Sequence, residues 1–337
     1  MYKLSIIMPV FNAERYLEKS LDSIINQSIG VENLEVIIVD DASTDKSGEI
    51  IDEYASRYPN FKAIHLTENI GGAYGPRNIA FRHVTAPYVM FLDADDTYTP
   101  GACEALYREI SNSNANVVFG RYNRVYDDIT LPSYSPYDSR NNDIKTYPEF
   151  GLVTGLVWKV MYRILYGKSL KYRDKVVIRD LNENPEILKI LPSIWTKIVR
   201  TDRLVDFKPY IAGEDVNFIV DMFLSGEVIF LNNETIVNYS MRLDGESITK
   251  NIKFKLVLDT IKSYREAIET LNQHDFRDVA MMINPFFVNY INLLRQGSFT
   301  PAEKEELYSE ISRIDEIYKK KGVMGFLLVK LIKILSK

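Results

Sequence analysis

The sequence contains a single cysteine, Cys103, among its 337 residues. One thiol excludes an internal disulfide framework and a zinc site built from cysteines, and it favours a protein of a reducing compartment. An excess of positive charge is also absent, because 41 Lys and Arg face 46 Asp and Glu, which gives a formal net charge of −5 at pH 7. A chain without a global positive field is not typical of nucleic-acid binding, so we expect no nucleic-acid partner.

Long apolar runs are absent as well. No stretch reaches the roughly 18–20 apolar residues that a membrane-spanning helix needs. The opening segment, MYKLSIIMPVFN, carries only a short apolar run and no small-residue cleavage site, which argues against a signal peptide. We therefore expect a cytoplasmic protein. Two basic segments described below leave peripheral contact with the inner face of the cytoplasmic membrane as an option.

What the sequence does contain is an alternation of apolar runs and helical patterns in its first third. Four nearly continuous apolar runs predict strands at residues 4–10, 34–41, 61–66 and 88–96. Apolar residues at helical spacing predict a helix in each of the first two intervals, with Ser43 and Thr44 as caps of the second. Strands that are apolar on both faces and joined by helices predict an α/β fold with a mostly parallel sheet covered on both sides.

The pattern is less regular beyond residue 100. Further helices are predicted at residues 102–110, 212–225, 252–296 and 302–320. Further strands are predicted at residues 116–126 and 227–232. The intervening residues 127–148 are rich in Asp, Ser, Pro, Tyr and Asn, which predicts a loop.

Acidic residues gather where two of the predicted strands end. The motif FLDADD places Asp93, Asp95 and Asp96 within four positions, where their carboxylates repel one another. Asp40 and Asp41 end another strand, and the carboxyl ends of parallel strands meet at one crevice. A divalent cation such as Mn²⁺ or Mg²⁺ binds carboxylate oxygens and would relieve the repulsion. The alternative is a solvated turn at a strand end.

Two further motifs lie at predicted helix starts. GGAYGPRN brings glycines and the guanidinium of Arg77 to a helix N-terminus, which suits a phosphate. The alternative is a glycine turn with a surface arginine. AGEDVNF places Glu214 and Asp215 at a helix start, where a carboxylate can act as a general base or merely stabilise the helix dipole.

Taken in order, these motifs resemble those of a known enzyme family. SIIMPVFNAERYLEKSLDSIINQS, VIIVDDASTD, NIGGAYGPRN, FLDADD and GED follow the order and spacing of family-two glycosyltransferases of the GT-A fold. The resemblance is greatest to bacterial wall teichoic acid enzymes that add N-acetylglucosamine to poly(ribitol phosphate), and to capsular and exopolysaccharide glycosyltransferases. It implies a nucleotide-diphospho-sugar transferase sheet followed by a mostly α-helical region.

The resemblance also implies a division of the chain. Residues 1–250 would form the GT-A catalytic domain, with a nucleotide-sugar half at 1–125 and an acceptor half at 126–250. Residues 251–337 would form a helical region with a basic amphipathic tail.

The resemblance assigns residues to the nucleotide and to the metal. Pro9, Phe11 and Asn12 would frame the uridine pocket, and Glu14 would lie near the ribose or base. Asp41 would accept a hydrogen bond from the uracil ring, with Asp40 supporting it. Arg77 would lie over the uridine and phosphates, with Asn78 behind it. Asp93, Ala94 and Asp95 would form the aspartate–x–aspartate motif, in which Asp95 contacts the Mn²⁺ or Mg²⁺ and Asp93 the ribose or a metal-bound water.

Other residues are implied for the reaction itself. Asp215 would be the general base, and Arg242 and Ser247 would belong to a loop that closes over the diphosphate. Trp195 and Glu214 are candidates for the acceptor site, although a tryptophan buried in the core is equally consistent with the pattern.

The implied activity is an inverting, metal-dependent transfer of a hexosyl or N-acetylhexosaminyl group. The donor would be a UDP-sugar, and the acceptor a hydroxyl of a cell-surface glycopolymer or of a lipid-linked glycan. The alternative is a catalytically silent module that binds nucleotide-sugar or glycan on the same fold. A sugar nucleotidyltransferase is disfavoured, because no glycine-rich loop follows the first strand.

Two basic segments do not belong to these motifs. Residues 152–173 combine a helical apolar stripe with a lysine- and arginine-rich face, and residues 321–337 are basic and apolar together. Each can contact an anionic membrane, a polyanionic polymer or the core of the protein itself. A homo-oligomer contact is a further option for the tail.

Overall fold

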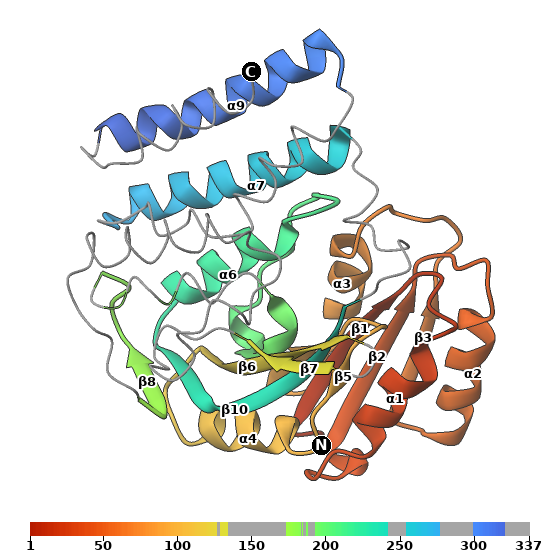
Figure 1. Cartoon of the computed structure of the whole chain (residues 1–337). Helices are drawn as coiled ribbons and strands as arrows, with labels where there is room; N and C mark the ends of the chain where they lie inside the picture. Colours follow the sequence, from red (N-terminus) through yellow and green to blue (C-terminus); the bar gives the residue numbers. More distant parts are fainter. Residues whose placement is uncertain are drawn as a thin grey trace.

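Strands and helices alternate along the first part of the chain, as the apolar pattern predicts (Figure 1). The computed structural model describes residues 1–126, 129–133, 173–182, 184, 187, 193–241, 254–276 and 299–320. The first four strands are β1 (Leu4–Val10), β2 (Leu34–Asp40), β3 (Phe61–His65) and β4 (Tyr88–Phe91). The helices between them are α1 (Leu17–Ile25), α2 (Ser47–Arg57) and α3 (Tyr74–Phe81), and the short helix η1 (Val31–Asn33) precedes β2.

The predicted later helices and strands appear in the predicted order, with two corrections. Residues 129–132 of the predicted loop 127–148 form a strand, because they pair antiparallel with residues 123–126, and the helix predicted at 252–296 covers 254–273. The helices are α4 (Ala102–Ser111), η5 (Ile194–Thr196), η6 (Thr201–Arg203), α6 (Glu214–Leu224), α7 (Phe254–Gln273) and α9 (Pro301–Lys320). The strands are β5 (Thr97–Tyr98), β6 (Val117–Tyr126), β7 (Ile129–Pro132), β8 (Lys175–Ile178), β9 (Lys197–Arg200) and β10 (Val228–Ser240).

The sheet changes character at β4. Its strand order is β3-β2-β1-β4-β9-β6-β10-β5, with β7 added to β6 and β8 to β10. The pairings among β3, β2, β1 and β4 are all parallel, as predicted. Beyond β4 the sheet is mixed, because β9 runs antiparallel to both β4 and β6. Since β9 begins opposite the carboxyl end of β4, the turn that precedes β9 lies at the same edge as the predicted acids.

Helix α2 begins later than its sequence suggests. Ser43 and Thr44 were expected to cap it, but the helix starts at Ser47 and has no side-chain cap. Ser43 and Thr44 instead meet Asn12 in the loop after β1: the Asn12 N–H donates to Ser43 Oγ at 3.0 Å, and the Thr44 N–H donates to Asn12 Oδ1 at 2.8 Å. Hydroxyl residues compete with helices by forming such local bonds.

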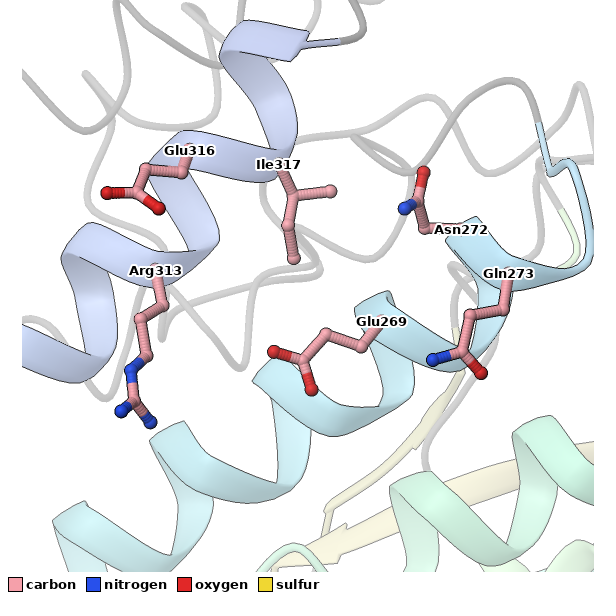
Figure 2. A pocket seen from close by; sticks show the side chains of 6 residues that line it. All are labelled: Glu269, Asn272, Gln273, Arg313, Glu316 and Ile317. Atoms are coloured by element: carbon pink, nitrogen blue, oxygen red, sulfur yellow. The ribbon is translucent and has the colours of Figure 1, made fainter.

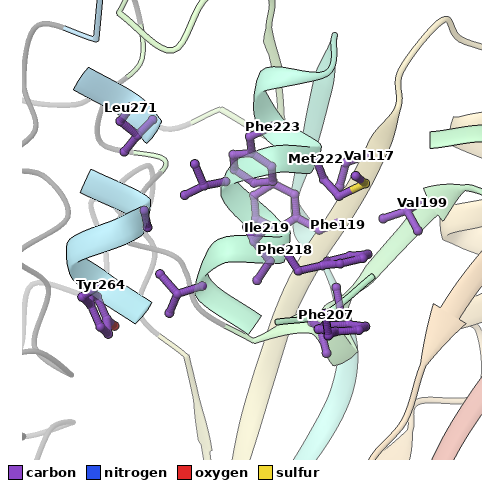
Figure 3. Close-up of a cluster of buried hydrophobic side chains, with 14 of the residues drawn as sticks. Val117, Phe119, Val199, Phe207, Phe218, Ile219, Met222, Phe223, Tyr264 and Leu271 are labelled. Carbon is purple, nitrogen blue, oxygen red and sulfur yellow. The ribbon is translucent and has the colours of Figure 1, made fainter. Parts of the chain in front are cut away.

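Helices cover both faces of the sheet and enclose two hydrophobic clusters. On one face α1, α2 and α4 bury residues such as Leu21, Ile51 and Leu106. On the other face the cluster extends from the sheet through α6 and α7 to α9 (Figure 1). Figure 3 shows this second cluster, in which the rings of Phe207 and Phe218 stack with centroids 4.2 Å apart.

Among residues that the structure describes, no helix has the length and apolar character needed to cross a membrane. The basic segments 152–173 and 321–337 lie outside the described residues, apart from Arg173. The predicted boundary near residue 250 stays a prediction.

Candidate active site

The carboxyl ends of β1, β2 and β4 place the predicted polar residues along one edge of the sheet. The parallel register pairs Val10 of β1 with Asp40 of β2 and Ile7 of β1 with Phe91 of β4. Residues that directly follow these strands therefore start at one edge, as expected for a ligand crevice in an open α/β sheet. Pro9 lies in β1 itself, and Phe11, just past its end, is 48% exposed.

The loop after β1 is fastened to the loop after β2. Besides the bonds of Asn12, the Lys46 N–H donates to Glu14 Oε2 at 2.9 Å and the Glu14 N–H donates to Asp45 Oδ2 at 3.0 Å. Asn12 has a positive φ of 49°, a conformation that asparagine tolerates better than most residues. Asn12 and Glu14 thus shape this edge, and their contacts with a nucleotide stay predictions.

Asp40 and Asp41 are both buried and hold neighbouring loops. Asp41 Oδ1 accepts from the Ile70 N–H at 2.9 Å, and its Oδ2 accepts from Asn69 Nδ2 at 3.1 Å. Burial raises the pKa of Asp41, although the backbone hydrogen bonds oppose this rise. Asp40 Oδ1 accepts from the Ser43 N–H at 2.9 Å, and its Oδ2 pairs with His65 Nδ1 at 3.0 Å.

Arg77 is the centre of a second group of carboxylates. Its Nη1 donates to Asp215 Oδ1 at 2.8 Å and to Glu214 Oε1 at 2.9 Å, and its Nη2 donates to Asp93 Oδ1 at 2.9 Å. The side chain is only 2% exposed, and its guanidinium lies 5.3 Å from the centre of the Phe207 ring. Helix α3, which follows the glycine-rich turn, therefore places Arg77 among the three carboxylates. A contact between Arg77 and a nucleotide stays a prediction.

The electrostatics of this group follow from three carboxylates around one cation. Burial, reinforced by the charge of Asp215 and opposed by Arg77, raises the pKa of Glu214 to about 8. Burial likewise raises the pKa of Asp215, while Arg77 lowers it and Asp93 raises it. Burial lowers the pKa of Arg77, but the three carboxylates outweigh it and raise the pKa overall. The protonated form of Glu214 is therefore favoured at neutral pH.

Lys197 is a buried cation beside this group that sequence reasoning missed. Its side chain is in the core, with Nζ donating to Ser193 O at 2.5 Å and to Thr196 Oγ1 at 3.3 Å. Burial lowers the pKa of Lys197 to about 7, although the charge of Asp215 opposes this fall. In the same turn the Ile194 N–H donates to Asp215 Oδ2 at 3.2 Å. The only signal was a lysine inside an apolar strand pattern.

Other predicted site residues have structural partners. Asn78 fastens the loop at Phe207 through two hydrogen bonds, of 2.8 and 2.9 Å, with its backbone. The Ala94 carbonyl accepts from Ser20 Oγ at 2.8 Å. Trp195 is 7% exposed, and its ring stacks on Tyr239 with centroids 5.1 Å apart. Arg242 and Ser247 lie outside the described residues.

Asp93 and Asp95 are the carboxylates that were predicted to bind a divalent cation. Asp93 and Asp95 are partly exposed, and Asp93 uses only Oδ1 for Arg77. Within the described ranges no three His, Cys, Asp or Glu side chains are grouped so that they could hold a metal ion alone. Mg²⁺ is commonly bound by one or two carboxylates together with substrate phosphates. The residues therefore fit an ion that arrives with a diphosphate rather than one enclosed by protein.

A pocket of about 330 Å³ lies elsewhere, between α7 and α9 (Figure 2). Its lining residues are Glu269, Asn272, Gln273, Arg313, Glu316 and Ile317. None of the residues predicted from the sequence lines it, so the candidate active site is the acid-rich sheet edge.

Comparison with known proteins agrees with the motifs. Residues 5–159 match the model of the family described as "Glycosyl transferase family 2". The minor teichoic acid biosynthesis protein GgaB of Bacillus subtilis is 27% identical over 360 residues, which cover 99% of this chain and 35% of GgaB. The poly(ribitol-phosphate) beta-glucosyltransferase of Bacillus spizizenii is 36% identical over 119 residues, which cover 35% of this chain and 19% of that protein. The chain thus spans about a third or less of the length of these relatives.

A solved structure shares the fold. Residues 1–349 of TarS from S. aureus, crystallised with UDP-GlcNAc, superpose with a TM-score of 0.74 at 20% identity, covering 99% of this chain and 88% of that one. The GT-A fold expected from the sequence is therefore confirmed.

Proposed function

Because residues 5–159 carry a glycosyl transferase family 2 domain, we propose that the protein is an inverting glycosyltransferase. It moves a sugar from a UDP-sugar to a hydroxyl of a bacterial cell-surface glycopolymer. The observation that carries the proposal is the convergence of Asp93, Glu214 and Asp215 on Arg77 at the carboxyl ends of the strands. A catalytic acid/base needs an environment that shifts its pKa, and this group provides one.

Asp215 acts as the general base. It removes a proton from the acceptor hydroxyl, and the oxygen attacks the anomeric carbon from the face opposite the departing UDP, so the configuration inverts. Its raised pKa makes it a stronger base than an exposed aspartate. Its two oxygens retain acceptor capacity beyond the bonds with Arg77 and Ile194, because a carboxylate offers about four lone-pair sites.

The remaining carboxylates have different tasks. Glu214 holds a proton at neutral pH. The pair Glu214–Asp215 then carries one negative charge instead of two. Asp95 and Asp93 would hold a Mn²⁺ or Mg²⁺ ion, whose positive charge would offset the negative charge that grows on the leaving group. Asp41 and Asn12 lie at the same edge, toward β2, where the uridine would bind.

The acceptor class rests on the relatives. GgaB is named for minor teichoic acid biosynthesis, and the relative from Bacillus spizizenii for glucosylation of poly(ribitol phosphate). The TarS structure contains UDP-GlcNAc. We therefore propose a teichoic acid or a related capsular or exopolysaccharide chain as acceptor, with Trp195 near the acceptor side of Asp215, and UDP-N-acetylhexosamine or UDP-hexose as donor. Peripheral membrane contact and a homo-oligomer remain additional proposals for segments 152–173 and 321–337.

A release assay tests the proposal. Wild type, Asp215→Asn and Asp95→Asn are each given a panel of UDP-sugars with Mn²⁺, with and without purified teichoic acid. We expect UDP release from one donor that depends on metal and acceptor, and a fall of about 10²–10⁴-fold in Asp215→Asn, the usual contribution of a general base. Exposed Asp52→Asn is the matched control and should retain wild-type rates.

The outcomes separate the alternatives. Release that persists at wild-type rate in Asp215→Asn would remove the base assignment. Metal-dependent UDP binding without release from any donor in the presence of the acceptor panel would favour the silent binding module on the same fold.

A further inference from the structure

Helix α7 places a polar face against the segment that leads into Asp215. Asp259, Ser263 and Glu266 are spaced four and three residues apart, so they lie on one side of the helix. Asp259 and Ser263 are completely buried or nearly so. Polar side chains are buried only when they are hydrogen-bonded, so their partners indicate what this face does.

Each of the three residues bonds to the segment 208–213. Asp259 Oδ2 accepts from the Ile211 N–H at 3.0 Å, and Ser263 Oγ donates to the Gly213 carbonyl at 2.5 Å. Glu266 accepts from the Tyr210 hydroxyl at 2.6 Å and from Lys208 Nζ at 2.9 Å. Three successive positions on one helix face thus bond to four of the six residues of this short segment.

The bond from Ser263 to the Gly213 carbonyl reaches the start of α6, the helix whose first turn contains Asp215. Gly213 has a φ of +82°, and a Cβ there would lie 3.3 Å from Ser263 Cβ and 3.4 Å from Thr260 Cα. The same Gly213 carbonyl accepts from the Val216 N–H at 3.0 Å and so closes the first turn of the helix. Asn217 Nδ2 donates to Ser263 Oγ at 2.8 Å, which ties the next turn to the same hydroxyl.

Ile211 of this segment also contacts the glycine-rich turn that precedes α3, the helix that carries Arg77. A Cβ added to Gly72 would lie 3.2 Å from Ile211 Cα, so the segment fits closely against that turn. The segment thus contacts both α7 and the turn before the helix of Arg77, whose Nη1 donates to Asp215 Oδ1 at 2.8 Å.

We propose that Asp259, Ser263 and Glu266 are positioning residues for Asp215, so that α7 forms part of the active site's supporting structure rather than a separate appendix. This inference rests on the proposed function, in which Asp215 is the base. A base displaced by a fraction of an ångström loses rate without losing affinity for the donor, because proton transfer depends steeply on geometry and nucleotide binding at the other loops does not.

The test compares two hydroxyl deletions in the same helix. Ser263→Ala removes the bond to Gly213, whereas Thr260→Val removes a buried hydroxyl that donates to the Leu256 carbonyl within α7 at 2.9 Å. Tyr210→Phe removes the bond to Glu266 from the partly exposed loop side and keeps the helix intact. For each variant we would measure kcat, KM for the UDP-sugar, thermal stability and hydrogen exchange of residues 210–216.

We expect kcat to fall about tenfold in Ser263→Ala and about threefold in Tyr210→Phe, with KM for the donor within twofold of wild type. Thr260→Val should keep the wild-type kcat. Its thermal stability should be similar to that of Ser263→Ala. Exchange at 210–216 should rise in Ser263→Ala and not in Thr260→Val. Unchanged kcat in both Ser263→Ala and Tyr210→Phe would overturn the inference and leave the proposed function intact.

Absence of turnover in wild type with every donor would count against the proposed function instead. The exchange measurement still decides the positioning role in that case. Equal protection of residues 210–216 in Ser263→Ala and Thr260→Val would overturn it.

Discussion

Two groups of carboxylates lie at one edge of the sheet and are held by opposite means. Asp40 and Asp41 accept hydrogen bonds from the backbone N–H groups of Ser43 and Ile70, which lie 3 and 29 positions along the chain. In the second group, Glu214 and Asp215 both accept from the guanidinium of Arg77, from which they are separated by 137 and 138 positions in the sequence. The first group is compensated mainly by hydrogen bonds from neighbouring loops, and the second mainly by the buried guanidinium of Arg77.

The difference predicts how each group fails. Loss of one backbone dipole near Asp40 or Asp41 affects one carboxylate, and the other donors remain. Loss of the guanidinium removes the main cation beside three partly buried carboxylates. The free-energy cost of that loss is far larger. The second group should therefore dominate both the stability of this edge and its response to pH.

The largest effect is expected for Arg77→Met. Breaking a buried ion pair from one side typically costs about 3–5 kcal/mol, because the remaining charge has no compensation. We expect a loss of this size in the free energy of unfolding, measured by urea denaturation at pH 7. Arg82→Met is the matched control, since Arg82 is 66% exposed and its pair with Asp206 is a surface pair worth at most about 1 kcal/mol. Equal losses in the two variants would contradict the comparison.

The next effect concerns Glu214→Gln and pH. The pKa of Glu214 is raised to about 8 from an ordinary 4.5, so the native state keeps a proton that the unfolded state releases. Its stabilising contribution is complete below pH 4.5 and is lost as the pH rises through 8. Unfolding of wild type should therefore become easier between pH 5 and pH 8, roughly the window of this shift, and Glu214→Gln should flatten that decline. Asp41→Asn provides the comparison from the other group, and an equal flattening there would count against the assignment.

Lys197→Met should reveal a dependence of similar size and opposite sign. The pKa of Lys197 falls to about 7 from 10.5, so the unfolded state binds a proton that the native state releases. This destabilisation is complete below pH 7 and disappears as the pH rises to 10.5, so stability rises in that window. Calorimetric melting between pH 7 and 10 should show the rise in wild type and its absence in Lys197→Met. A rise that persists in the variant would assign it to another group.

The smallest effect is expected at His65, which belongs to the first group. The hydrogen bond with Asp40 raises the pKa of His65, while burial opposes it. Its contribution is present below the ordinary pKa of 6.5 and is lost as the pH rises through the raised value. Because the side chain is 39% exposed, solvent screens the pair, and His65→Gln should change the pH dependence of the melting temperature between pH 6 and 8 only slightly. A change as large as that in Glu214→Gln would reverse the ranking of the two groups.

Much of this architecture could be predicted from local patterns. The runs at 4–10 and 34–41 became β1 and β2 within one residue, because buried strands of a parallel sheet need continuous apolar side chains. The placement of Asp41 and Asp93 at one edge followed from strand direction alone. Prediction was weaker where a strand joins the sheet from afar: β9 runs antiparallel beside β4, and no local pattern indicates its direction.

The sequence by itself determined the first strands and helices and the types of residue at the sheet edge, since periodicity and motif spacing act over a few residues. Only the tertiary structure decided that Arg77 donates to Asp93 and Asp215 and that the charge of Asp215 acts on the buried Lys197. It also decided that Ser263 of α7 bonds to Gly213. These contacts join residues separated by up to 138 positions. They depend on how helices pack on the sheet, and that packing is decided by the whole core rather than by any segment of it.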